Sequence, residues 1–306
     1  MRNIIKTSYQ NFINFNSSKY KTVITLTIFA LCINFLVVAF ILIHFFVSEN
    51  EFQDKCPTIP IDNPILTSGL VLYFRFNKQS IYGENRNFVC DLSGNSNNGK
   101  AHGVTWNAIG GKLEDGAFEF KGINDRITVK DADSLSPNTT GNFTVSFWVK
   151  FTDKDFLGEG SKRDYANFLG KGYVEKGYEW VFRQYNSSNS EARNNRISFY
   201  AFNKEGGLGA GSYFQEEMLE EDWIYITGVI DNGHVKIYKN GILWNTRPLS
   251  EYNITLENGK SDLFIGKMGI KNYFDGSIDE LRIYNISLNN SQIMALYQSS
   301  MNWSNQ

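Results

Sequence analysis

The chain has 306 residues, a formal net charge of −2 and an apolar content of 42%, which suffices for one large β domain or two average ones and argues against wholesale disorder. The charge is unevenly spread, because residues 1–48 hold four basic and no acidic side chains and the remainder therefore carries about −6. This balance excludes nucleic acid as an expected partner, since nucleic-acid binding depends on basic patches.

An apolar run from residue 22 to residue 48 is the first predicted element. It contains no Asp, Glu, Lys or Arg and exceeds the roughly 20 residues that a helix needs to cross the hydrocarbon of a bilayer. Lysines precede the run at positions 19 and 21, acidic residues follow it, and the basic flank belongs in the cytoplasm. We therefore predict a cytoplasmic segment at 1–21, an uncleaved transmembrane signal-anchor helix at 22–48 and an extracytoplasmic C-terminal domain, as in a single-pass cell-membrane protein.

Two other interpretations of this run fit less well. A cleaved signal peptide needs a shorter apolar region and a small-x-small cleavage site, whereas this run ends in His44-Phe45-Phe46-Val47. A lipoprotein acylated at Cys32 needs a lipobox, but Phe29-Ala30-Leu31 is a poor one and the apolar run continues past it. The run is better explained as an anchor.

Two cysteines lie beyond the apolar run. Cys56 and Cys90 form either one disulfide in an oxidising compartment or two reduced, unrelated thiols. The choice stays open here because sequence does not give the Cα separation that a disulfide requires. Residues 49–68 contain three prolines and little periodicity, which predicts a stiff, extended stalk.

Short strands at regular spacing begin at residue 69. Strict alternation over 143–149 predicts that Phe143, Val145, Phe147 and Val149 share one face of a half-buried sheet. The other predicted strands are 70–76, 117–120, 126–129, 223–230, 234–238, 242–244 and 277–284.

Turns and one helix complete the predicted elements. Asn232-Gly233 and Asn240-Gly241 supply the positive φ angles of two-residue hairpin turns. The apolar pattern of residues 289–298 predicts a short helix with Ile293, Leu296 and Tyr297 on one face. Many short strands with almost no helix indicate a β-sandwich, so we predict one domain at 69–298 and a tail at 299–306.

Several segments resemble the laminin-G-like, concanavalin A-like jelly rolls found in many surface proteins. They are the opening strand Gly69–Phe74, the Asp91–Gly99 turn, the central strand Phe143–Val149, the closing strand Phe274–Tyr284 and the helix Asn289–Tyr297. The resemblance covers about three-quarters of the chain. It implies an all-β, antiparallel jelly-roll β-sandwich, which the transmembrane helix predicted from the apolar run precedes. The family is functionally diverse, so the fold alone does not dictate the function.

The turn from Asp91 to Gly99 is rich in carboxylate, amide and carbonyl oxygens, which suit Ca²⁺. The resemblance implies that the turn lies near the Asp279-Glu280 pair, because the first and last strands would be neighbours. The ligands predicted for calcium are Asp91, Asn95, Asn97, Gly99 and Asp279. The alternative is a plain Asx turn that needs no metal.

Tryptophans are candidates for a sugar-stacking platform, since a pyranose face packs on an aromatic ring. Trp148 is predicted to be a core residue, and the candidates are Trp106, Trp180, Trp223, Trp244 and Trp303. The polar segments 153–166 and 184–196 are candidates for specificity, because binding residues concentrate on loops, although solvated insertions would look the same.

Catalysis finds little support in the motifs. The chain has three histidines and no HExxH, GxSxG or CxxC motif. The acidic cluster at 216–222 is typical of a solvated turn. A glycosidase needs two opposed carboxylates at a defined separation, which a sequence neither shows nor excludes.

The expected function is therefore a surface-displayed binding or adhesion module that recognises a glycan or a protein partner, with structural calcium, and not an enzyme. The alternatives are a structural cell-envelope domain without a small ligand and an enzyme that acts on polysaccharide. Seven Asn-x-Ser/Thr sequons beyond the apolar run are compatible with a glycosylated surface protein; they start at Asn138, Asn142, Asn186, Asn253, Asn285, Asn289 and Asn302.

Overall fold

The computed structural model describes residues 26, 28–42, 56, 67–77, 84–85, 87–112, 116–137, 141–153, 165–173, 177–189, 191–216, 222–266 and 274–301. The chain divides into two compact units, residues 1–54 and residues 55–306. Asn138, Asn302, Trp303, the whole predicted segment 1–21 and most of the predicted segment 49–68 lie outside the described residues.

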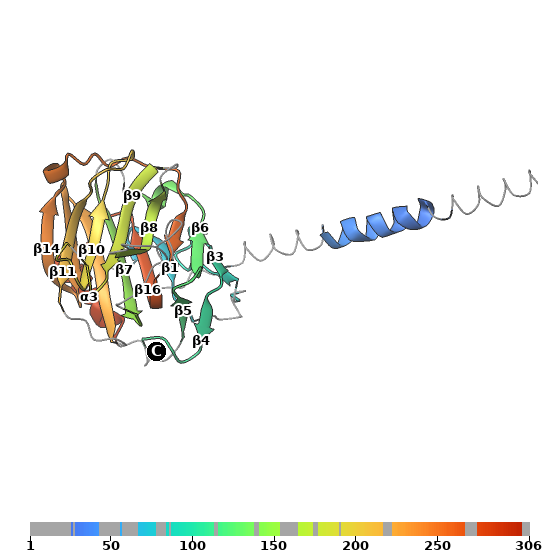
Figure 1. Cartoon of the computed structure of the whole chain (residues 1–306), viewed down its shortest axis with the longest axis horizontal. Helices are drawn as coiled ribbons and strands as arrows, with labels where there is room; N and C mark the ends of the chain where they lie inside the picture. The colour runs from blue at the N-terminus through green and yellow to red at the C-terminus, as the bar shows by residue number, and fades with distance from the viewer. Residues whose placement is uncertain are drawn as a thin grey trace, which may run out of the picture. The chain divides into compact units, whose positions relative to one another are not determined.

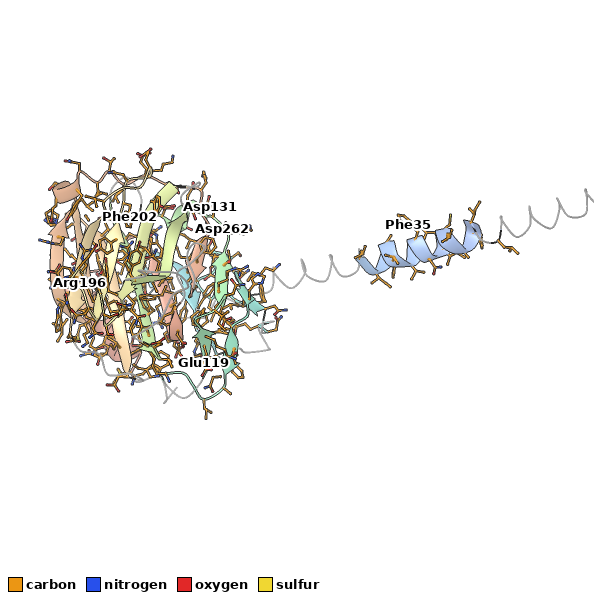
Figure 2. All side chains as sticks on the ribbon, viewed as in Figure 1. Phe35, Glu119, Asp131, Arg196, Phe202 and Asp262 are labelled. Atoms are coloured by element: carbon orange, nitrogen blue, oxygen red, sulfur yellow. A yellow bond between two sulfur atoms is a disulfide. The ribbon has the colours of Figure 1, made fainter. Side chains whose placement is uncertain are left out.

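The described part of the first unit is helical. Residues 28–42 form a helix whose side chains are almost all exposed, Phe35 among them (Figure 2). Within the described residues, no helix is both long enough and apolar enough to cross a membrane. The predicted span of 22–48 extends past this helix at both ends, so a transmembrane helix is not confirmed.

The second unit is an antiparallel β-sandwich, as predicted, and Figure 1 shows its two sheets as stacked layers. The strands of sheet A follow in the order β14 (Ile242–Pro248), β13 (His234–Lys239), β12 (Trp223–Asp231), β7 (Phe143–Phe151), β16 (Asp275–Tyr284), β5 (Ala117–Lys121) and β4 (Thr105–Asn107). A further strand, β1 (Leu70–Phe74), lies outside this order and pairs with β16.

Sheet B also has eight strands in the part of the chain that the structure describes. Their order is β11 (Ala210–Gln215), β10 (Arg196–Ala201), β9 (Gly177–Tyr185), β8 (Tyr165–Tyr173), β15 (Leu263–Ile265), β6 (Arg126–Val129), β3 (Gly99–His102) and β2 (Phe88–Val89). The described helices of this unit are η2 (Asp133–Leu135), η3 (Leu249–Tyr252) and α3 (Asn290–Ser299).

The main core lies between the sheets and is rich in aromatic side chains. Phe147 of β7 meets Phe182 of β9 edge to face, with ring centroids 4.9 Å apart, and Phe182 stacks on Phe199 of β10 at 4.6 Å. Such pairs add about 0.5–1.5 kcal/mol each beyond the area they bury. The predicted face of β7 is confirmed, because Phe143, Val145, Phe147 and Val149 all belong to this core.

A second core covers the other face of sheet A, so β7 is buried on both faces and not half-buried as predicted. The helix α3 provides much of this cover through Ile293 and Leu296. Trp148 packs against Tyr297 with ring centroids 5.7 Å apart, and its Nε1 donates to Ser300 Oγ at 3.0 Å. The helix begins where predicted, because Asn289 and Gln292 form a capping box at its N-terminus.

The two Asn-Gly hairpins are confirmed. Asn232 and Gly233 have φ angles of 47° and 75°, and Asn240 and Gly241 have 50° and 80°. These are the left-handed values that a two-residue turn requires. They connect β12 to β13 and β13 to β14, which pair as consecutive antiparallel strands.

Cys56 and Cys90 form a disulfide, with a Cα–Cα distance of 5.5 Å. The bond ties residue 56 to the position directly after β2, where Cys90 is completely buried. Of the two alternatives left open by the sequence, the structure selects the disulfide.

Candidate functional site

The Asp91 carboxylate is occupied by donors from the chain itself. Its Oδ1 accepts from the backbone N–H groups of Tyr73 and Ser93, each at 2.9 Å. Its Oδ2 accepts from Ser93 Oγ and from the backbone N–H of Asn97, also at 2.9 Å. Burial raises the pKa of Asp91, and these hydrogen bonds oppose the rise. The carboxylate therefore organises an Asx turn.

The rest of this turn docks onto β1. Asn95 Nδ2 donates to the carbonyl of Leu70 at 3.1 Å, and Asn97 Nδ2 donates to that of Val71 at 2.7 Å. A Cβ on Gly99 would lie 2.8 Å from Ile127 Cγ2, so close packing explains this glycine. These contacts satisfy the edge of β1 that does not pair with β16, which protects the sheet from further pairing.

Asp279 lies on β16, where its Oδ2 accepts from the backbone N–H of Lys112 at 3.0 Å and its Oδ1 from that of Glu280 at 2.8 Å. No contact joins its carboxylate to Asp91 in the part of the chain that the structure describes. Among the described residues, no group of three His, Cys, Asp or Glu side chains is placed to hold a metal ion. Hydrogen bonds explain these residues without a metal, and the calcium site stays a prediction.

The predicted tryptophan platforms have different environments. Trp180 is completely buried in the core, and its Nε1 donates to the carbonyl of Leu135. Trp106 and Trp223 are partly buried. Trp244 on the edge strand β14 is 48% exposed and meets Phe214 with centroids 6.0 Å apart. These tryptophans do not gather into one platform.

A different aromatic surface lies on the outer face of sheet B. Successive residues of a strand point to opposite sides of the sheet. Trp180 and Phe182 of β9 point into the core. Arg183 and Tyr185 alternate with these core residues along the strand and therefore point to the outer face of the sheet. The neighbouring strands β8, β10 and β11 contribute Tyr165, Asn167, Arg196, Tyr200 and Tyr213 to what we call the tyrosine–arginine face, with Phe202 beside them; Figure 2 labels Arg196 and Phe202.

Arg183 is the centre of this face. Its guanidinium carbon lies 3.9 Å from the Tyr165 ring centroid and 4.8 Å from that of Tyr200. Its Nε donates to Asn167 Oδ1 at 2.9 Å, and Asn167 is its partner in register on β8. The two rings come from the strands on either side of β9, so the strand pairing itself assembles the site. Each such cation–π contact contributes about 0.5–1 kcal/mol at an exposed site.

The segment after β9 adds a second guanidinium. Asn189 Oδ1 accepts from the backbone N–H groups of Glu191 and Arg193, which shapes this loop. Arg193 Nη1 then donates to Tyr185 Oη at 3.1 Å. This is one of the two polar segments predicted to carry specificity. In the other, residues 154–164 lie outside the described part of the chain.

Two tyrosine hydroxyls share this environment. Tyr185 Oη lies 3.1 Å from Tyr200 Oη and accepts from Arg183 Nη1 at 3.4 Å. Burial acts to raise the pKa of Tyr185, but the two arginines and the Tyr200 hydroxyl bring it below the ordinary value of 10.0. Burial and the neighbouring Tyr185 raise the pKa of Tyr200 to about 12. Tyr185 is therefore the phenol of the pair that ionises first.

A second polar cluster lies at one end of the sandwich, where Asp131 and Asp262 are labelled in Figure 2. The buried Lys171 ammonium lies 2.6 Å from Glu179 Oε1 and 2.7 Å from Asp131 Oδ1. Asp262 accepts from the backbone N–H of Asp131 at 3.0 Å. Because its charges are paired with one another, this cluster is better explained as a structural ion-pair network.

The tyrosine–arginine face is not among the sites predicted from the sequence. Arg183 and Tyr185 alternate with Phe182 and Gln184, which is the signal of a strand with one polar face. That signal does not reveal the neighbours, since Tyr165 and Tyr200 enter the site only through the pairing of β9 with β8 and β10.

Comparisons with known proteins agree with this architecture. The family model described as "Concanavalin A-like lectin/glucanases superfamily" matches residues 121–294, more than half of the chain. The chain belongs to this superfamily. Its name covers both lectins and glucanases, so membership leaves binding and catalysis both possible. No curated protein matches the chain.

Several solved structures share the fold. The binding domain of Paraclostridial Mosquitocidal Protein 1 matches with a TM-score of 0.56 and 17% identity, covering 78% of this chain and 53% of that one. The binding domain of Botulinum neurotoxin DC matches in complex with SialylT, with a TM-score of 0.54, 16% identity, and coverage of 76% and 52%. It also matches in complex with rat synaptotagmin II, with a TM-score of 0.56, 16% identity, and coverage of 78% and 53%. This chain thus spans about half the length of these binding domains.

Proposed function

We propose that the protein is a binding module whose ligand surface is the tyrosine–arginine face of sheet B, and that its ligand is a glycan or a glycan-bearing surface protein. The observation that carries the proposal is the position of Arg183, held between the rings of Tyr165 and Tyr200 on the outer face of the sheet. Partly exposed aromatic rings with a few fixed polar groups are the usual composition of a sugar site.

The comparisons support a binding role. The three matched structures named above are described as binding domains, and two of them hold a glycan or a protein partner. The motif content adds to this support, since the three histidines of the chain fall in no catalytic motif. An enzyme acting on polysaccharide and a structural envelope domain are the competing functions.

The test is a glycan array probed with the full chain purified in detergent. We expect saturable binding to a subset of glycans, and we expect Arg183→Ala to abolish it. Arg126→Ala is the matched control, because Arg126 lies on β6 of the same sheet, away from β8–β10. Binding that survives Arg183→Ala, or an array without signal, would refute the proposal. Release of reducing ends from a bound polysaccharide would favour the enzyme.

We also propose that residues 22–48 anchor this module in a membrane, with residues 1–21 in the cytoplasm. The absence of charge over this run and the basic residues before it support the proposal. Alkaline carbonate washing of membranes should leave the full chain in the pellet. Protease added to intact cells should remove an epitope placed after residue 306 and spare one placed before residue 1. Extraction by carbonate would contradict the anchor, and the opposite protease pattern would contradict the orientation.

A further inference from the structure

Three arginines gather on the tyrosine–arginine face of a domain that is otherwise acidic. Residues 49–306 carry a net charge of about −6. Arg183 comes from β9, Arg193 from the loop that follows it, and Arg196 from the start of β10. Each of them lies against a tyrosine ring, with guanidinium carbons 3.9, 5.6 and 3.8 Å from the ring centroids of Tyr165, Tyr185 and Tyr213.

The charge of Arg183 is not compensated inside the described part of the chain. None of the described Asp and Glu side chains forms an ion pair with it. Its Nε and Nη1 donate to the neutral side chains of Asn167 and Tyr185, and its Nη2 has no hydrogen-bond partner among the described residues. A partly buried guanidinium with a vacant donor is suited to an anionic acceptor from outside the chain.

Arg193 adds its charge at the same place. Arg183 Nη1 and Arg193 Nη1 both donate to Tyr185 Oη, at 3.4 and 3.1 Å, so a single neutral oxygen draws two cations together. Arg193 also pairs with Glu191 at 3.2 Å, but the Glu191 side chain is 59% exposed and its contribution is screened by solvent. An anion bound beside Tyr185 would relieve the repulsion between the two guanidiniums.

Arg196 repeats the arrangement one strand further on. Its guanidinium stacks on Tyr213 and donates through Nε and Nη2 to Gln215 Oε1, at 3.0 and 2.8 Å, again a neutral acceptor. Ser198 lies in register between Arg183 and Tyr213, and its buried Oγ has no hydrogen-bond partner among the described residues. The face thus combines unsatisfied polar groups with the partly exposed rings of Tyr165, Tyr200 and Tyr213, whereas Tyr185 is buried beneath the arginines.

We propose that the ligand is an acidic glycan whose carboxylate binds the guanidiniums of Arg183 and Arg193, while its sugar rings pack on the tyrosines. This inference rests on the proposed function and names the class of ligand for the same face. Positive charge supplies the selection for acidic sugars over neutral ones, and the rings supply the contact area that sugars of both kinds use.

The test compares acidic probes with their neutral methyl esters. Titration calorimetry of the full chain in detergent would use sialyllactose and polygalacturonate, each against its own methyl ester. We expect at least one acidic probe to bind roughly 10- to 100-fold more tightly than its neutral counterpart, as a charge-assisted hydrogen bond allows. The affinity should fall as sodium chloride is raised.

Arg193→Gln and Arg183→Gln should each weaken the acidic probe by roughly 10-fold or more and weaken its neutral counterpart by a smaller factor. Because Arg193 lies on a loop, we expect Arg193→Gln to leave the fold intact, so that a loss of binding in this variant is not due to misfolding. Arg126→Gln is the control. Equal affinity for acidic and neutral probes, lost in Tyr200→Ala, would overturn the acidic selection and leave the proposed binding face intact. Absence of binding to every probe would also overturn the acidic selection. Binding that none of these variants affects would overturn the acidic selection and refute the proposed face.

Discussion

Arg282 and Glu280 form a buried ion pair two residues apart on β16, with Arg282 Nη2 donating to Glu280 Oε2 at 2.5 Å. Tyr73 joins them, since its hydroxyl donates to Glu280 Oε2 and accepts from Arg282, both at 2.9 Å. The pair lies where β16 changes partner, from β5 at residues 275–278 to β1 at residues 281–284. Glu280 has a φ of 53°, which places it in a bulge of the strand.

Glu280→Gln should therefore destabilise the fold. The substitution keeps the shape of the side chain but leaves Arg282 with an uncompensated buried charge, which costs roughly 3–5 kcal/mol. Thermal and denaturant melts of the full chain measure the loss. Glu251→Gln is the control, because Glu251 forms a partly exposed ion pair with Arg247, at 3.6 Å, that contributes at most about 1 kcal/mol. Equal effects of the two substitutions would show that the buried network is not stabilising.

Asp91→Asn tests the alternative explanations of the turn. Each oxygen of the Asp91 carboxylate accepts two hydrogen bonds. In Asp91→Asn an NH₂ group replaces one of these oxygens and faces two donors, which then lose their acceptor. We expect a loss of roughly 2–4 kcal/mol, since each unsatisfied donor costs about 1–3 kcal/mol. Asn95→Ala, which removes a more exposed contact with Leu70, should cost less.

Repeating both melts with millimolar Ca²⁺ decides between hydrogen bonding and metal binding. A metal that binds only the folded protein must raise the melting temperature. Because the Asp91 oxygens are already occupied, we expect the wild-type melt to be independent of calcium. A calcium-dependent rise that Asp91→Asn removes would establish the site that the sequence predicts and refute the hydrogen-bonded explanation.

The elements that could be predicted from the sequence depend on local signals. Positive φ at Asn232 and Asn240 and the alternation of Phe143 to Val149 act within a few residues. The turns and the shared face of β7 were predicted correctly, but the half-buried sheet was not, because the second core comes from distant residues. The role of Glu280 could not be predicted, because its partner Tyr73 is 207 residues away and meets it only through the register of β1 and β16.

The same limit applies to the candidate site. The resemblance directed attention to Asp91 and Asp279, whose carboxylates prove to bind backbone N–H groups. The tyrosine–arginine face contains no motif, since each of its strands contributes only one or two residues. Only the strand order β8, β9, β10 brings Tyr165, Arg183 and Tyr200 together.

Removing the disulfide should lower stability by about 3–4 kcal/mol in the chain-entropy model, because the bond closes a loop with a sequence separation of 34 residues. The double substitution Cys56→Ala/Cys90→Ala, compared with the wild type in a denaturant melt, measures the effect. Cys32→Ala is the matched control, since Cys32 is free and exposed. A loss below about 1 kcal/mol for the double variant would mean that the bond restrains the unfolded chain little.

The titration of Tyr185 should set the upper pH limit of anion binding. Its pKa in the folded protein lies below 10.0, so between that value and 10.0 the folded state binds fewer protons than the unfolded state. Stability from this group is therefore present above pH 10 and is lost as the pH falls through the folded pKa. Tyr200, with a pKa of about 12, behaves oppositely: its stabilising contribution is present below pH 10 and is lost as the pH rises towards 12.

Ionised Tyr185 would place a negative charge between Arg183 and Arg193 and compete with an anionic ligand for both guanidiniums. We expect the affinity for an acidic glycan to decline as the pH approaches 10, in step with the first phenolate seen in the ultraviolet absorbance. Tyr185→Phe should remove both the early phenolate and the decline. Tyr213→Phe, on the same face but not bonded to Tyr185, should leave both in place. If the decline persists in Tyr185→Phe, another group limits binding at high pH, and the contact of Tyr185 with the two arginines does not control it.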